Sequence, residues 1–297
     1  MSWLQLRLDT DPASSAVLES RLLAAGAVAV TLEDNADQPL LEPGVGEMPL
    51  WRETRLTGLF PADADIDAVL AELDPALLSR CNQRVEILED KDWEREWMQH
   101  YRPMQFGRRL WVCPSWLQPP QPDAITLLLD PGLAFGTGTH PTTALCLTAL
   151  DTLPLDQAHV VDYGCGSGIL AVAAGRLGAQ RLLCVDNDPQ ALVATRDNAS
   201  RNSIAEASLQ VALPGDYDDA PWRGRSDLVL ANILAGPLLS LSATLLAFLR
   251  PGGTLLLSGL LASQADEVIA HYQSDISLRV SGEQDDWVCL QGRLPMS

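Results

Sequence analysis

The chain has 297 residues, of which 47% are hydrophobic and 20% charged, and its formal net charge is −19. That length favours two domains, and a mean hydropathy of +0.05 is typical of a soluble globular protein. Because the sequence contains a single lysine, Lys91, its charge argues against direct nucleic-acid binding and favours a basic protein partner.

Residues 1–90 contain apolar residues at two different spacings. Alternation in Leu4–Leu8 indicates a half-buried strand, and helical spacing follows Pro12 until Gly26. The remaining elements that we expect are strand 27–32, strand 51–60, helix 66–77 and a strand near 85–87. The order βαββαβ predicts a small α+β, ferredoxin-like domain. Without a glycine-rich loop or a cluster of His, Cys or acids, it is expected to bind a substrate rather than catalyse; a purely structural role is the alternative.

Residues 91–104 form a charged segment rich in aromatic residues. Trp93, Trp97, His100 and Tyr101 recur at helical spacing, and Pro103 ends the pattern. We expect a linker helix that packs its aromatic residues on a domain, with a ridge that docks substrate as the alternative.

In the third region, 105–297, the first predicted core element is a buried strand at 125–129. The loop that follows, 130–143, holds three glycines and four threonines. Thr139 or His140 can cap the next helix, with Pro141 at its first position. The hydroxyl and N–H groups of this loop can hold a polar ligand, and His140 is expected to cap or pack rather than act as a base.

A glycine-rich turn between two apolar strands is the most informative pattern of the sequence. Gly164, Gly166 and Gly168 follow strand 160–163, and Asp186 ends the next strand. Such glycines let the backbone approach a ligand, and an acid at that strand end can accept both ribose hydroxyls. Asp162 before the turn would repel a pyrophosphate but hold a cationic amine, so S-adenosylmethionine is favoured over NAD.

Another polar side chain follows the apolar run 228–231. Asn232 ends this strand, where ligands of parallel sheets bind, and it can hold the cofactor or a substrate nitrogen. Capping of the next helix is the alternative. A helix at 238–249 and strands at 254–258, 277–280 and 287–291 complete a Rossmann-like sheet of seven strands.

These motifs resemble the bacterial family of methyltransferases that modify ribosomal protein L11. The resemblance rests on 129–143, 162–170, 185–189 and 231–235, and residues 93–97 also look like the family's. It implies a methyltransferase domain over 105–297 in which Thr143, Gly164, Asp186 and Asn232 contact S-adenosylmethionine, with Gly166 in the same loop. It also implies that the first domain recognises the ribosomal protein and that the linker presents several amines in turn.

We therefore expect an enzyme that methylates lysine side chains, an N-terminal α-amine, or both, on that large-subunit protein. Asn232 is the expected catalytic residue, steering the amine without a covalent intermediate. The alternatives are a methyltransferase for RNA or a small molecule, a cofactor-binding module without turnover and, more distantly, an NAD oxidoreductase.

The cysteines and the N-terminus bear on where the protein acts. Six cysteines without a C-x-x-C motif argue against a zinc site and a disulfide framework, so no metal is expected. The sequence shows no signal-peptide pattern and no run near the roughly 20 apolar residues of a membrane span. We expect a cytoplasmic monomer that does not contact a membrane.

Overall fold

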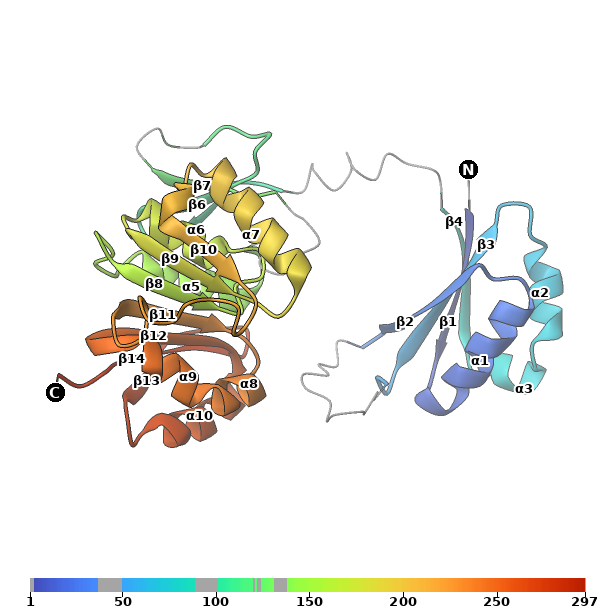
Figure 1. Cartoon of the computed structure of the whole chain (residues 1–297). Helices are drawn as coiled ribbons and strands as arrows, with labels where there is room; N and C mark the ends of the chain where they lie inside the picture. The colour runs from blue at the N-terminus through green and yellow to red at the C-terminus, as the bar shows by residue number, and fades with distance from the viewer. Residues whose placement is uncertain are drawn as a thin grey trace. The chain divides into compact units, whose positions relative to one another are not determined.

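The computed structural model describes residues 3–36, 50–88, 101–119, 121, 124–130 and 138–296. The chain forms two compact units, residues 1–99 and 100–297, and each has its own hydrophobic core (Figure 1). Over the described residues, no helix combines the length and apolarity that crossing a bilayer requires.

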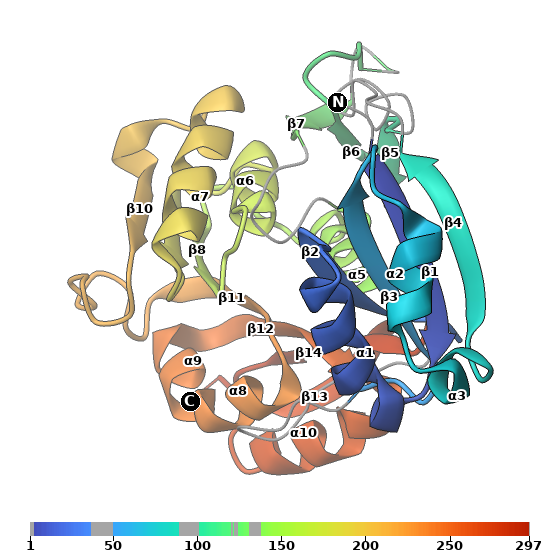
Figure 2. The ribbon, with the colours of Figure 1, turned by 90° about the vertical axis from the view of Figure 1, so that its right-hand side faces the viewer.

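The first unit is a four-stranded antiparallel sheet covered by helices on one face (Figure 2). Leu6 and Leu8 point to the helices and are fully buried, as the alternation predicts. The strand order β2-β3-β1-β4 with the chain order βαββαβ is ferredoxin-like. Its elements are β1 (Trp3–Thr10), α1 (Pro12–Ala24), β2 (Ala29–Asp34), β3 (Thr54–Pro61), α2 (Ile66–Glu72), α3 (Pro75–Leu78) and β4 (Asn82–Leu88).

The predicted helix 66–77 is two helices, because the chain leaves the helix at Leu73, where ψ is 149°. Asp74 then caps α3 ahead of Pro75. The predicted linker helix lies mostly outside the described residues. Its last residues are not helical: 101–103 have no regular structure, and Met104 begins a strand.

The second unit is built on a seven-stranded sheet of order β10-β9-β8-β11-β12-β14-β13. The first five strands are parallel, and β14 is antiparallel to both neighbours. The strands are β8 (His159–Tyr163), β9 (Arg181–Val185), β10 (Leu209–Ala212), β11 (Ser226–Asn232), β12 (Leu249–Leu261), β13 (Ser277–Gln284) and β14 (Trp287–Arg293). The prediction of seven strands is confirmed, although it lacked β10. Strand 125–128 belongs elsewhere, to a small sheet of β5 (Met104–Phe106), β6 (Leu110–Cys113) and β7 (Ile125–Leu128).

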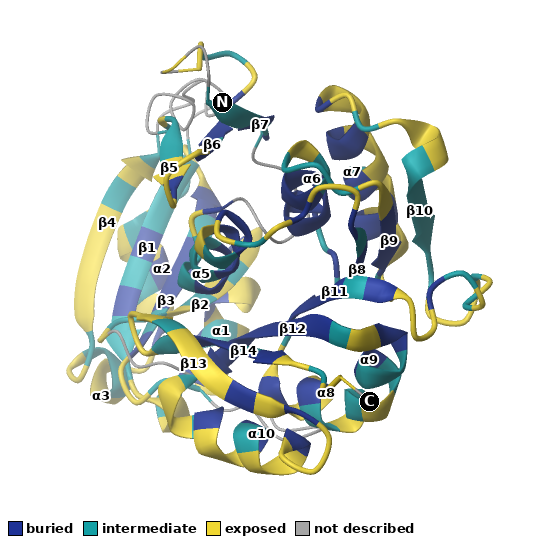
Figure 3. Cartoon of the chain, turned by 90° about the vertical axis from the view of Figure 1, so that its left-hand side faces the viewer, coloured by how far each residue is buried: buried dark blue, intermediate teal, exposed yellow. Residues whose placement is uncertain are grey.

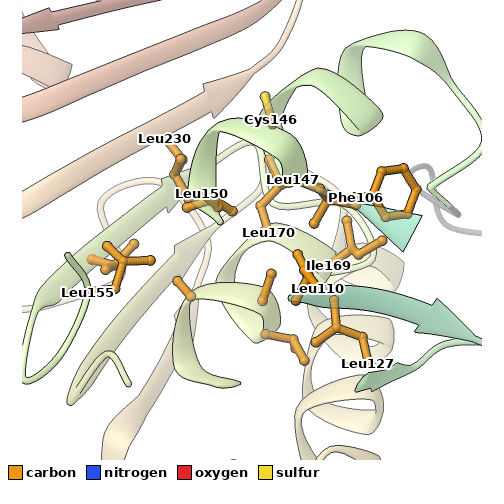
Figure 4. Close-up of a cluster of buried hydrophobic side chains, with 14 of the residues drawn as sticks. Phe106, Leu110, Leu127, Cys146, Leu147, Leu150, Leu155, Ile169, Leu170 and Leu230 are labelled. Carbon is orange, nitrogen blue, oxygen red and sulfur yellow. The ribbon is translucent and has the colours of Figure 1, made fainter. Parts of the chain in front are cut away.

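Helices cover both faces of this sheet, which explains why its central strands are mostly apolar. One face packs against α5 (Pro141–Leu150), α6 (Ile169–Arg176) and α7 (Pro189–Arg201), and the other against α8 (Ala235–Ser240), α9 (Ser242–Phe248) and α10 (Ala265–Tyr272). Leu147 from α5, Leu170 from α6 and Leu230 from β11 meet in the core between the sheet and the helices α5–α7 (Figure 4). Strands β11 and β12 are largely buried, whereas β13 at the edge is exposed (Figure 3).

Candidate active site

A cavity of about 630 Å³ opens at the carboxyl ends of the central strands. Strands β9 and β10 lie on one side of β8, and β11 and β12 on the other, so the cavity lies where the strand order reverses. That is where open α/β sheets bind ligands. The walls are mostly apolar and are formed by His140, Thr142, Tyr163, Gly164, Val185, Asp186, Asn187, Pro214, Asn232, Ile233, Leu234, Pro237, Leu241, Gly259 and Trp287.

The turn after β8 requires glycine for two reasons, its backbone conformation and a close neighbouring side chain. Gly164, Gly166 and Gly168 have φ of 80°, 54° and 75°, a region that residues with a Cβ rarely adopt. A Cβ on Gly164 would also overlap Cγ2 of Ile233. Backbone O of Ile233 would likewise collide with a Cβ on Gly259. These two glycines therefore make room for the turn that follows Asn232.

Asp186 lies on the cavity wall at the end of β9, as predicted. Its Oδ2 accepts the N–H of Gly166 at 2.8 Å, and its Oδ1 accepts the N–H of Asp188 at 3.0 Å. A carboxylate oxygen has two acceptor lone pairs, so each can take one more donor. Two adjacent hydroxyls of a ribose suit this arrangement. Gly166 does not line the cavity and instead orients the carboxylate.

Asn232 ends β11 and is one of the residues that line the cavity. Its Nδ2 is 3.4 Å from Oγ1 of Thr143, which lies on α5 and is fully buried. Its Oδ1 is shielded from solvent and has no hydrogen-bond partner among the described residues. Since a buried acceptor is costly without a donor, this oxygen suits an N–H of a ligand. Thr143 lies behind Asn232 rather than on the wall.

Asp162 lies deeper than the sequence suggests. Its side chain is buried, and Oδ2 accepts the N–H of Ala171 in α6 at 3.0 Å. Burial raises the pKa of this carboxyl to about 7, with a contribution from the negative charge of Asp186. The carboxyl does not line the cavity. The reason is strand alternation: Tyr163, the next residue, lines the cavity instead.

The start of α5 forms another part of the wall. His140 is the N-cap, with Pro141 at the first position, so the capping role is confirmed. Nδ1 of His140 accepts the N–H of Thr142 at 3.3 Å, and burial lowers the pKa of the ring. The ring also packs edge-on against Trp287, with centroids 5.0 Å apart. Residues 131–137 of the threonine-rich loop lie outside the described residues.

Sequence reasoning did not single out Trp287, Gly259 or Leu234 as site residues. Trp287 begins β14, 55 residues after Asn232, so nothing local connects them. Gly259 carried a signal: a glycine inside the apolar run of β12 indicates close backbone approach.

The residues present fit S-adenosylmethionine. Apolar walls suit an adenine ring, the Asp186 carboxylate suits ribose hydroxyls, and the Asn232 oxygen suits an N–H donor. The part of the chain that the structure describes contains no group of three or more His, Cys, Asp or Glu placed to hold a metal ion.

Known proteins are similar to this chain along its whole length. A family model described as ribosomal protein L11 methyltransferase (PrmA) matches residues 2–295. Proteins named ribosomal protein L11 methyltransferase are 53% identical in Pseudomonas aeruginosa strain LESB58, over 99% of both chains, and 50% identical in Teredinibacter turnerae, over 98% of this chain and 97% of the relative.

Among solved structures, a ribosomal protein L11 methylase from Lactobacillus delbrueckii subsp. bulgaricus is 33% identical, with a TM-score of 0.58. The similarity covers 66% of this chain and 100% of that one. Together with the cavity, these similarities show that the chain belongs to the ribosomal protein L11 methyltransferase family and is an enzyme that uses S-adenosylmethionine as its methyl donor.

Proposed function

We propose that this protein transfers methyl groups to amines of ribosomal protein L11, either lysine side chains, the N-terminal α-amine, or both. Full-length similarity to proteins named for that reaction supports the substrate. The observation that carries the chemistry is a cavity lined by both Asp186 and Asn232, whose shielded amide oxygen has no hydrogen-bond partner among the described residues.

Asp186 and the glycine turn are the groups that we expect to hold the cofactor, through its ribose hydroxyls and through close backbone approach. When bound, S-adenosylmethionine supplies an electrophilic methyl group on a sulfonium sulfur. Gly166 keeps the Asp186 carboxylate oriented, since its N–H donates to Oδ2.

The acceptor amine must be neutral before it can act as a nucleophile. A lysine of pKa about 10.4 is neutral in about one molecule in 2,500 at pH 7, whereas an α-amine near 7.7–8.0 needs less help. The apolar cavity walls disfavour an ammonium ion and so lower the pKa of an amine that enters.

Asn232 would steer the amine by accepting a hydrogen bond from one of its N–H groups, which would leave the nitrogen lone pair free to react with the methyl group. Orientation of this kind contributes roughly 7–11 kcal/mol in well-aligned systems. His140 does not need to act as a base, because its Nδ1 already accepts the N–H of Thr142. The reaction thus proceeds by direct displacement, without a covalent intermediate.

The proposed division of labour follows the two units. The ferredoxin-like domain, residues 1–90, recognises the ribosomal protein, and residues 91–104 let it present several amines to the methyltransferase domain, 105–297. The net charge of −19 supports a basic protein substrate over naked nucleic acid. We further propose that the enzyme acts as a monomer in the cytoplasm.

The direct test incubates the protein and labelled S-adenosylmethionine with purified ribosomal protein L11 or with naked ribosomal RNA. Label on L11 alone supports the proposal, provided that Asp186→Ala abolishes it. Val193→Ala is the control, because Val193 is 58% exposed on α7 and does not line the cavity. Label only on RNA, or on neither acceptor, contradicts the proposed substrate.

Asn232→Ala tests the steering role. We expect turnover to fall at least a hundredfold while the variant still folds, as judged by circular dichroism. Normal turnover in this variant overturns the assignment of Asn232.

A further inference from the structure

The cavity extends along the end of the sheet where the parallel strands finish, from β9 to β14. Val185 and Asp186 lie at the end of β9, Asn232 at the end of β11, Gly259 on β12 and Trp287 on β14. Because the sheet order is β9-β8-β11-β12-β14, Asp186 and Trp287 lie at opposite ends, with Asn232 between them. If Asp186 takes the ribose, the end at β12 and β14 is left for the acceptor.

That end has an aromatic wall, which we define as Trp287 and His140. The two rings pack edge to face, with centroids 5.0 Å apart and planes at 69°. Both residues line the cavity, and Trp287 is only partly buried. An indole face attracts cations more strongly than the other aromatic side chains, above all cations that have shed their water.

The ring of His140 is compatible with a cation beside it. Burial lowers its pKa, which favours the neutral imidazole, and the neutral ring does not repel a positive charge. The Nδ1 atom lies 2.8 Å from the hydroxyl of Thr142 and accepts the N–H of the same residue, which fixes the ring plane.

Trp287 is also held in place by its surroundings. It follows a two-residue turn, Asp285–Asp286, and is paired with Gln284 across the β13–β14 hairpin and with Leu261 on β12. The wall is therefore built on paired strands and a helix N-cap, which are more precise supports than a free loop.

We propose that the aromatic wall binds the acceptor's ammonium group, and that Trp287 is a specificity-determining residue for cationic amines. This inference rests on the proposed function for the identity of the acceptor. The wall offsets part of the desolvation cost that the apolar cavity imposes on an ammonium ion, so the amine can enter beside Asn232 as a cation and then lose a proton to water. Its lone pair forms the N–C bond while the C–S bond breaks, and sulfur keeps the bonding pair.

The sharpest test compares choline with 3,3-dimethyl-1-butanol, its uncharged isostere with carbon in place of nitrogen. Nuclear magnetic resonance titrations would use the full chain saturated with S-adenosylhomocysteine. We expect wild type to bind choline at least fivefold more tightly than the alcohol, Trp287→Phe to retain part of that ratio, and Trp287→Leu to bring it near one. An unchanged ratio in Trp287→Leu overturns the proposal, as does a wild-type ratio of one.

Kinetics separate this role from a structural one. In Trp287→Leu we expect the KM for ribosomal protein L11 to rise at least fivefold, while the KM for S-adenosylmethionine changes less than twofold and thermal melting stays cooperative. A parallel rise in both KM values indicates a damaged fold and overturns the assignment. If wild type does not methylate L11, the proposed function fails, yet the choline comparison still tests the wall.

Discussion

At the residue scale, the site depends on a few positions whose side chains are fixed by close neighbours. Gly164 and Gly259 both leave space for Ile233, and Asp186 is held by two backbone N–H groups. Asn232 keeps an acceptor without a partner among the described residues. Small changes at these positions are therefore expected to affect both ligand binding and stability.

Gly164→Ala provides one such change with a matched control. Gly164 and Gly224 have φ of 80° and 67°, but a Cβ at Gly224 would meet nothing within 4 Å. Gly224→Ala should cost about 1–2 kcal/mol of unfolding free energy, from backbone strain alone. Gly164→Ala should cost more and weaken cofactor binding at least tenfold, as measured by calorimetric titration. Equal effects of the two substitutions on binding contradict the steric argument.

Asp162 predicts a pH dependence of stability. Its pKa in the folded protein is about 7, against 3.8 for an unperturbed carboxyl, so the folded state holds a proton that the unfolded state releases. The contribution of Asp162 to the free energy of unfolding is therefore most favourable below about pH 4. It falls as the pH rises to 7, by up to about 4 kcal/mol.

The measurement is urea unfolding of wild type and Asp162→Asn at pH 5 and pH 8. Asparagine can still accept the N–H of Ala171, but it cannot ionise. The difference in unfolding free energy between the two proteins should move in favour of Asp162→Asn at pH 8. Parallel pH profiles would show that Asp162 does not titrate in this range.

At the element scale, the hairpin of β13 and β14 places Trp287. Its turn residues, Asp285 and Asp286, have φ of 49° and 64°, the conformation that two-residue hairpins require and that glycine adopts most easily. The hairpin therefore keeps its geometry at some conformational cost.

Replacing Asp286 by glycine should relieve that cost. We expect Asp286→Gly to raise the unfolding free energy by about 0.5–1 kcal/mol, measured by denaturant titration. Gln284→Gly is the control, since Gln284 lies in β13, where glycine has no such advantage. A loss of stability in Asp286→Gly comparable to that of the control would rule out strain at this turn.

Most elements could be predicted from sequence because their patterns are local. The strand before Gly164, the strand ending at Asp186 and the ferredoxin-like order of the first domain are confirmed. The predicted helix 238–249 is two helices, α8 and α9, separated at Leu241. Its residues are apolar except for Ser240, Ser242 and Thr244, so periodicity did not mark the break.

Other differences arise from pairing between distant segments. Strand β10 is only half-buried, so it lacks the apolar run of its neighbours. Strand β7 has that run but pairs with β6 in a separate small sheet, because its partner is chosen by tertiary packing. The aromatic wall also brings together α5 and β14 by tertiary packing, so no local sequence pattern predicts it.

At the scale of the whole molecule, each unit buries its own apolar residues. The core of the first unit holds Leu18, Leu22 and Phe60, and no hydrophobic cluster of described residues draws from both units. The residues that line the cavity, including those proposed to bind the cofactor, all belong to the second unit.

Removal of the first unit should therefore separate cofactor binding from substrate use. A chain of residues 101–297 is expected to bind S-adenosylmethionine within threefold of the full chain, measured by calorimetric titration. Its kcat/KM for ribosomal protein L11 should fall at least a hundredfold. A truncated enzyme that methylates L11 as efficiently as the full chain contradicts the recognition role of the first domain.

The separate cores imply that the protein has two folding equilibria rather than one. A ligand in the cavity adds its binding free energy to only one of them, about 2.7 kcal/mol at a concentration one hundred times its Kd. S-adenosylhomocysteine should then raise the melting temperature of the methyltransferase unit and leave the ferredoxin-like unit unchanged. When the cofactor is scarce, the catalytic unit loses this protection against proteolysis, and the abundance of active enzyme becomes tied to the supply of its own methyl donor.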